Sequence, residues 1–286
     1  NKNKMRKLVT ILILLVAFTV NAQEKKEEVK SNWKKGGNIT FLFNQSAFKN
    51  WQAGGINSVA GTFGLNYDFN YAKDNWTWDN KIIASYGLTK LKGEGTQKTD
   101  DRFEFNSLVG KKAEGYWYYS AFLNFKTQMS STDVNGVQQS HFFSPAYLQL
   151  GPGMLWKKHD NLKVNIAPAT SKLVMVHGHF TDNLAAGTTY FGVDPNKTIR
   201  YELGAAVSAY YKVELLENVS MENILNLYSD YLDKPGNVDI DYTINFVMKI
   251  NKYMSTNLSL QAIYDDNAIK DLQTKEVFGL GINYIF

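Results

Sequence analysis

Apolar and polar residues alternate along this chain over stretches far longer than ordinary β-strands. From Val59 to Tyr71 every second residue is apolar or glycine, and the residues between are small or polar. A period of two places the two kinds of residue on opposite faces of a strand. About thirteen residues at roughly 3.3 Å each, tilted near 40°, rise about 33 Å, enough to cross an apolar band about 25 Å tall. Soluble strands average about five or six residues. The pattern therefore predicts strands that span a membrane.

The same alternation recurs along the rest of the chain and predicts about twelve strands. They are expected at residues 38–44, 59–71, 76–88, 103–109, 117–125, 146–156, 162–166, 199–213, 219–227, 238–250, 258–264 and 277–286. Pro152 lies inside one of them and indicates a bulge or bend. An even number near twelve is typical of bacterial outer-membrane barrels.

The connections between these strands alternate in length. Short turns are expected at residues 73–75, 111–115, 157–161, 214–218 and 251–256, and longer loops at 45–58, 89–101, 127–145, 167–198, 229–237 and 265–276. This alternation indicates an all-β, transmembrane up-and-down antiparallel barrel with short periplasmic turns and longer extracellular loops. The alternative is a secreted sandwich or lipocalin-like barrel with its apolar faces turned inward, which predicts shorter strands and no such alternation.

The two ends of the chain indicate export to the outer membrane of a Gram-negative bacterium. Met5 is followed by Arg6 and Lys7, an apolar run and the small residue Ala22, the order of a cleaved secretory signal peptide. An uncleaved anchor is the alternative, but the run is shorter than the roughly 20 residues of a spanning helix. We expect upstream residues and signal peptide at 1–23, a polar periplasmic leader at 24–35 and the barrel at 36–286. The last strand, which ends in Phe286, resembles the closing strand of outer-membrane barrels. This implies recognition by the barrel-insertion machinery.

The two faces of the predicted strands have different roles. The lumen-lining residues expected are Asp79, Lys81, Arg102, Glu104, Lys126, Arg200, Glu202, Lys212, Asp239 and Asp241. Their mixed signs favour a narrow lumen joined by ion pairs, with a selective solute channel as the sharper alternative. On the opposite face, Trp76, Trp78, Trp117, Tyr119, Trp156, Tyr211, Tyr284 and Phe286 are expected to form an aromatic girdle beside the short turns.

Other candidate sites carry weaker signals. His177 and His179 lack a clear third metal ligand, and Ser171, Ser208 and His177 cannot be assigned to a hydrolase arrangement. The acid pairs Asp100–Asp101 and Asp265–Asp266 could attract calcium, but solvated loop acids are the simpler interpretation. No cysteine is present, which excludes a lipoprotein and a disulfide framework. We therefore expect no catalytic residues, no metal and no cofactor.

One loop motif is unusual. Asn50, Trp51, Gly54 and Gly55 form an Asn-Trp-x-x-Gly-Gly element, in which the glycines permit close backbone approach and the Trp can anchor the loop. With the Asp-Asp-Arg-x-Glu-x-Asn-Ser stretch at residues 100–107, the sequence resembles a family of outer-membrane barrels known only as a domain of unknown function. The resemblance implies a signal-bearing barrel and assigns no catalytic residue.

The function expected from the sequence is passive: a small-solute channel or a scaffold that presents its loops. The alternative is an accessory subunit of an outer-membrane protein secretion or assembly complex, and a lipid-modifying hydrolase is the least favoured. The expected partners are outer-membrane lipid, the insertion machinery and such a complex. Nucleic acid is not expected, because the net charge of +4 is small and dispersed.

Overall fold

The computed structural model describes residues 31–48, 56–134 and 136–286 of the chain. The predicted signal peptide, most of the predicted leader and the motif residues Asn50, Trp51, Gly54 and Gly55 lie outside the described residues. No helix in the described ranges has the length and apolar character needed to cross a membrane.

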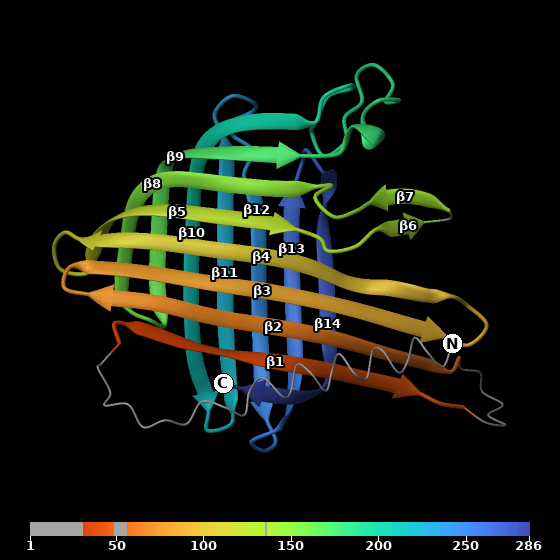
Figure 1. The fold of residues 1–286 in the computed structure, drawn as a ribbon, viewed down its shortest axis with the longest axis horizontal. Helices are drawn as coiled ribbons and strands as arrows, with labels where there is room; N and C mark the ends of the chain where they lie inside the picture. The colour runs from red at the N-terminus through yellow and green to blue at the C-terminus, as the bar shows by residue number, and fades with distance from the viewer. Residues whose placement is uncertain (1–30, 49–55, 135) are drawn as a thin grey trace. The chain divides into compact units, whose positions relative to one another are not determined.

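Twelve antiparallel strands of the described chain close into a barrel (Figure 1). They are β1 (Trp33–Ser46), β2 (Ser58–Lys73), β3 (Trp76–Leu91), β4 (Thr96–Lys112), β5 (Trp117–Thr127), β8 (Ala146–His159), β9 (Leu162–Met175), β10 (Ile199–Leu216), β11 (Val219–Asp230), β12 (Asp239–Lys249), β13 (Met254–Asp265) and β14 (Ile269–Ile285). Each barrel strand pairs with the next along the chain, and β1 pairs with β14. The predicted all-β up-and-down barrel is confirmed.

The barrel has two different ends. At the end called the turn rim, residues 74–75, 113–116, 160–161, 217–218 and 250–253 connect the strands. At the opposite end, called the loop rim, the connections are 47–57, 92–95, 128–145, 176–198, 231–238 and 266–268. The connection 128–145 contains a separate hairpin of β6 (Thr132–Val134) and β7 (Val137–Ser140), and 176–198 contains the short helix η1 (Gly178–Phe180).

Several predicted boundaries were wrong because the strands continue past their alternating apolar cores. The predicted loops 89–101 and 265–276 are the short connections 92–95 and 266–268, so Asp100 and Asp101 lie in β4. Strand β9 runs to Met175, not to residue 166, and β1 begins at Trp33, inside the predicted leader. Backbone pairing, such as that of Trp33 with Tyr71, extends these strands where the side-chain alternation has ended. The bulge expected at Pro152 is confirmed, since the β8–β9 register shifts between Leu150 and Met154.

Apolar side chains cover the outside of the barrel and polar side chains fill the inside. Phe63, Phe278 and Ile282 are 43%, 55% and 60% exposed on the outer face. By contrast, the interior polar residues Glu202 and Thr243 are 0% and 4% exposed. An apolar exterior around a polar interior is the arrangement of a transmembrane barrel, and it excludes the soluble alternative with its apolar faces inside.

The barrel closes through the pairing of β1 with β14. The register aligns Asn38 with Ile285 and Phe43 with Leu280. Two further backbone hydrogen bonds join Gly37 and Phe286, with N–O distances of 2.9 and 3.1 Å. A Cβ atom at Gly37 would lie 2.4 Å from the carbonyl oxygen of Asn66. Glycine is therefore required where three chain segments meet at this seam.

Candidate functional site: the charged lumen

Ion pairs cross the lumen near the loop rim. Lys172 of β9 contacts Glu202 of the neighbouring strand at 3.0 Å and Asp239, on β12, at 2.9 Å. Arg200 donates from Nε to Glu202 at 2.9 Å and contacts Asp230 at 3.6 Å. The Lys172 ammonium also lies 4.7 Å from the centre of the Tyr228 ring. Glu202 is fully buried and Lys172 is 4% exposed, so the loss of either charge would leave the other buried without its partner.

A second set of charges lies one step further inside. Arg102 contacts Glu104 on its own strand, and Lys126 of β5 donates to Asp241 of β12 at 2.6 Å. Asn106 and Asn124 donate to Glu104 at 2.8 and 3.1 Å. Because β5 and β12 are separated by four strands around the wall, the Lys126–Asp241 pair joins opposite parts of the barrel. The interior is thus narrowed by side chains at this level.

A third set lies near the turn rim. Lys157 donates to both carboxylate oxygens of Asp79 at 3.0 Å, and Lys163 donates to one of them at 2.8 Å. Lys81 of β3 contacts Glu222 of β11 at 3.5 Å, and Tyr210 donates its hydroxyl to the same carboxylate at 2.9 Å. The Lys81–Glu222 pair reaches between distant strands of the wall, whereas Tyr210 and Glu222 lie on neighbouring strands.

A cavity of about 420 Å³ lies among these charges. We call it the turn-rim vestibule, because it reaches Lys34, Asp160 and Asn161 at that rim. Its charged wall includes Asp79, Lys163 and Lys212, and the apolar side chains Phe122 and Leu155 form another part of the wall. Leu155 is fully buried, and Phe122 packs against a buried cluster of Ala167, Ala206 and Tyr228. Further along β4 and β5 the cavity is lined by Glu104 and Asn124, so the apolar part of the wall lies between polar levels.

The β9–β10 connection packs into the loop-rim mouth. Its Val193 is fully buried against Val174 of β9, and Tyr147, Tyr190 and Phe191 pack on the same cluster. Arg200 donates to the carbonyl oxygen of Gly192 at 3.3 Å. The Tyr190 hydroxyl donates to the carbonyl oxygen of Gln139 in β7, and Figure 1 shows this connection beside the β6–β7 hairpin. Burial raises the pKa of Tyr190 to about 12, so its hydroxyl remains a donor at neutral pH.

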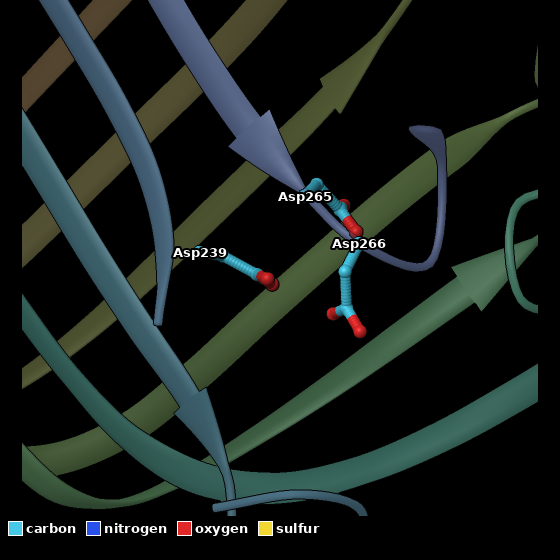
Figure 2. A group of neighbouring side chains, drawn as sticks. All are labelled: Asp239, Asp265 and Asp266. Atoms are coloured by element: carbon cyan, nitrogen blue, oxygen red, sulfur yellow. The ribbon is translucent and has the colours of Figure 1, made fainter. Parts of the chain in front are cut away.

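Three carboxylates gather at the same rim. Figure 2 shows Asp239 pointing towards Asp265 and Asp266, and one oxygen from each lies within 4.8 Å of the others. Asp239 is already paired with Lys172 at 2.9 Å, and Asp266 accepts from Asn237 at 2.9 Å. Oxygen ligands of this kind are those that calcium and magnesium prefer. This is the group of described residues that could hold a metal ion, and lysine and amide donors already contact it.

The structure places all ten predicted lumen residues on inward-facing strand positions. Those with ion pairs are Asp79, Lys81, Arg102, Glu104, Lys126, Arg200, Glu202, Asp239 and Asp241. Lys212 lines the vestibule and has no ion pair within 4.0 Å among the described residues.

The predicted girdle residues lie near the turn rim. Trp76, Trp78, Trp117, Tyr119, Tyr211, Tyr284 and Phe286 are exposed, and Trp156 is half-buried and packs against Tyr116. Trp33, which the sequence placed in the leader, adds a further ring at 5.7 Å from Trp78. Ring contacts join the aromatic side chains of β3, β1, β2 and β14 in one row, namely Trp78, Trp33, Phe69, Tyr67, Phe286 and Tyr284.

The remaining candidates are dispersed. Ser171 lies on the outer face beside the Tyr201 hydroxyl at 3.2 Å, whereas Ser208 lines the vestibule. The His177 ring accepts a hydrogen bond from the backbone N–H of His179. No serine hydroxyl is hydrogen-bonded to a histidine ring in the described ranges. This arrangement does not assemble the serine and histidine that a hydrolase needs.

Several central lumen residues lie outside the predicted set. Lys157 lies in β8 and not in the predicted turn 157–161, and Lys172 lies in β9 and not in the predicted loop 167–198, because both strands extend past their predicted ends. The alternation in β11 is irregular and does not single out Glu222. In β9 the inward residues lie at odd positions up to Ala167 and at even positions from Thr170, because the register with β10 shifts between them, so alternation alone does not carry the inward face from Lys163 to Lys172.

Part of the chain matches a known family of proteins. Residues 43–132 match the model of a family described as "Protein of unknown function (DUF3078)". No curated protein sequence matches the chain.

Solved outer-membrane barrels are similar in fold. The COG4313 outer membrane channel from Pseudomonas putida F1 is 10% identical, with 92% of this chain and 98% of that one covered and a TM-score of 0.40. The translocator domain of the autotransporter NalP from Neisseria meningitidis is 8% identical, with 100% and 97% covered and a TM-score of 0.35. The outer membrane channel DcaP of Acinetobacter baumannii is 13% identical, with 91% and 99% covered and a TM-score of 0.35. At these values the likeness extends to barrel architecture and to nothing finer.

Proposed function

We propose that this protein is a passive outer-membrane channel whose narrow lumen admits ions and small polar solutes. The observation that carries the proposal is the polar lumen itself, which contains a cavity of about 420 Å³ and ion pairs between distant strands. The size of the cavity restricts the solutes to small ones.

The location follows from the same proposal. The apolar exterior contacts outer-membrane lipid, and the predicted signal peptide directs export. The turn rim then faces the periplasm and the loop rim faces outward, as in bacterial barrels. The strand that ends in Phe286 is the segment that the insertion machinery would recognise. Neither catalysis nor nucleic-acid binding is part of the proposed role.

Single-channel recording from the purified barrel in planar bilayers tests the proposal. We expect small, resolvable conductance steps, because the Lys126–Asp241 pair crosses the lumen at 2.6 Å. The double variant Lys126→Ala with Asp241→Ala removes both partners, leaves no unpaired charge and widens the lumen, so its steps should be larger.

The matched control removes an ion pair outside the lumen. Lys197 and Asp194 are an exposed pair at 3.2 Å in the β9–β10 connection, and their double replacement by Ala should leave the conductance unchanged. If wild type and lumen variant are both silent, the channel is excluded. Silence together with a stoichiometric partner in pull-downs from native outer membranes would favour the accessory-subunit alternative.

A further inference from the structure

The turn-rim vestibule contains more basic than acidic side chains. Asp79 is contacted by two ammonium groups, those of Lys157 and Lys163, although one would neutralise it. Among the described residues Lys34 forms an ion pair with the exposed Asp160 alone, at 3.8 Å, and Lys157 contacts the same Asp160 at 3.2 Å. The cavity wall as a whole holds an excess of one positive charge, because five lysines and four acids line it: Lys34, Lys35, Lys81, Lys163 and Lys212, and Asp68, Asp79, Glu104 and Asp160.

Lys212 adds to this excess. It lines the vestibule from β10 and forms no ion pair with any described residue within 4.0 Å. It interacts electrostatically with Glu222, which is already contacted by Lys81, Tyr210 and Asn245. A lysine that no carboxylate holds is available to a mobile anion.

Another part of the same wall has the opposite character. Phe122, Leu155 and Leu108 line it, between the lysines of the rim and the polar Asn124 and Glu104 further along the strands, and Leu155 has no exposed surface. Ligand sites in proteins combine a mostly apolar wall with a few placed polar groups, in cavities of about 300–1,000 Å³. The vestibule, at about 420 Å³, meets both conditions.

We infer that the turn-rim vestibule binds a small organic anion, with its charged group at Lys163 and Lys212 and its apolar part against Phe122 and Leu155. This inference rests on the proposed channel function and names the solute class for the same lumen. A short-chain carboxylate has the required chemistry: one anionic end and an apolar body small enough for the cavity. An inorganic anion would satisfy the lysines and make no use of the apolar part of the wall.

Equilibrium dialysis of the full barrel in detergent, with radiolabelled probes, tests the inference. We expect hexanoate to bind at least about tenfold more tightly than hexanamide, which lacks the charge, and than acetate, which lacks the apolar body. Lys212→Met should weaken hexanoate binding about tenfold, because one charge-assisted contact is lost. Lys197→Met, a lysine change in the β9–β10 connection, is the matched control for uptake of the probe by detergent.

A second variant, tested together with a folding assay, separates a loss of binding from a loss of folding. Ser208→Phe adds volume at the vestibule wall and should abolish hexanoate binding, while heat-modified migration on gels reports that the barrel is folded. Equal binding of the three probes, or equal binding by Lys212→Met and Lys197→Met proteins, overturns the inference. Binding by a barrel that is silent in bilayers supports the vestibule and rejects the channel; conductance without binding gives the reverse result.

Discussion

The two halves of the lumen use charged side chains differently. Near the loop rim, Lys172 and Glu202 are almost completely removed from solvent and contact each other at 3.0 Å. Near the turn rim Asp79 is also buried, between Lys157 and Lys163, but at the mouth Lys34 and Asp160 are largely exposed and lie 3.8 Å apart. The first kind of pair fixes the positions of strands, since neither charge can remain alone in a dry interior. The second kind contributes little to stability and remains available to solutes.

The sign of the excess charge also differs between the halves. Asp239, Asp265 and Asp266 gather at the loop rim, whereas the vestibule at the other rim holds an excess of lysine. A count over the whole lumen finds both signs mixed and misses this separation by depth. Charge that is separated along a pore makes passage depend on direction, because each mouth attracts ions of a different sign.

Removing a buried partner near the loop rim should have the largest effect. Lys172→Met leaves Glu202 with Arg200 alone and Asp239 without its ion pair, in a region where unpaired charge is costly. We expect the free energy of unfolding to fall by about 3–5 kcal/mol. Urea titration of the barrel in lipid vesicles, followed by tryptophan fluorescence, measures the change.

The control for this variant is an exposed lysine pair. Lys197→Met disrupts the exposed contact with Asp194 and should change the same free energy by less than about 1 kcal/mol. Replacing Glu202 by Gln in the Lys172→Met background should restore part of the loss, because one unpaired charge is removed. A loss below about 1 kcal/mol for Lys172→Met would mean that the buried pair does not hold the loop-rim half together.

The sequence predicted the barrel well, because its physical signal is repeated in every strand. Alternation from Val59 to Tyr71, or from Ile199 to Val213, follows directly from a wall with lipid on one side and water on the other. Strand ends were predicted poorly for the same reason. Beyond the apolar band both faces of a strand are polar, as at Lys270 and Asp271 in β14, and the alternation disappears although the backbone pairing continues.

The partners of the lumen charges could not be predicted. The alternation of inward and outward positions within each strand places Lys126 and Asp241 inside the barrel. Their contact, however, depends on the curvature and register of strands far apart in sequence. The vestibule is harder still to predict, because the apolar part of its wall combines Phe122 of β5 with Leu155 of β8, at positions where the alternation predicts polar residues. In the sequence these apolar residues are exceptions to the alternation, and only the closed barrel brings them together.

The hydrogen bond between the β9–β10 connection and the β6–β7 hairpin should have a smaller effect than the buried ion pairs. Tyr190→Phe removes the hydrogen bond to the Gln139 carbonyl oxygen. The free energy needed to open the packed segment 176–198 should therefore fall by about 1 kcal/mol. Cleavage of this segment by subtilisin should become roughly fivefold faster. Tyr231→Phe, which removes a bond to Pro168 at 3.0 Å on the same rim, is the matched control and should leave that rate unchanged.

The pH dependence of the same cleavage follows from the pKa of Tyr190. Burial raises that pKa from 10.0 to about 12, so the closed segment keeps a proton that the open segment loses. Protection should be complete below pH 10 and fall as the pH rises towards 12, because ionisation favours the open form. The Tyr190→Phe protein should lack this fall; a parallel fall in both proteins would assign it to other groups.

The smallest change in stability is expected in the turn-rim half, at Lys212. Its ammonium has no ion pair within 4.0 Å among the described residues, so Lys212→Met should alter the free energy of unfolding by less than about 0.5 kcal/mol.

The effect of Lys212→Met on conduction should be different, because one positive charge is lost from a mouth that holds an excess of lysine. With a salt gradient across the bilayer, the reversal potential should move towards the value of a more cation-selective pore. The same measurement on Lys197→Met should show no shift. A Lys212→Met barrel that is strongly destabilised, yet unchanged in selectivity, would place this lysine with the structural charges of the loop-rim half and remove the distinction between the two halves.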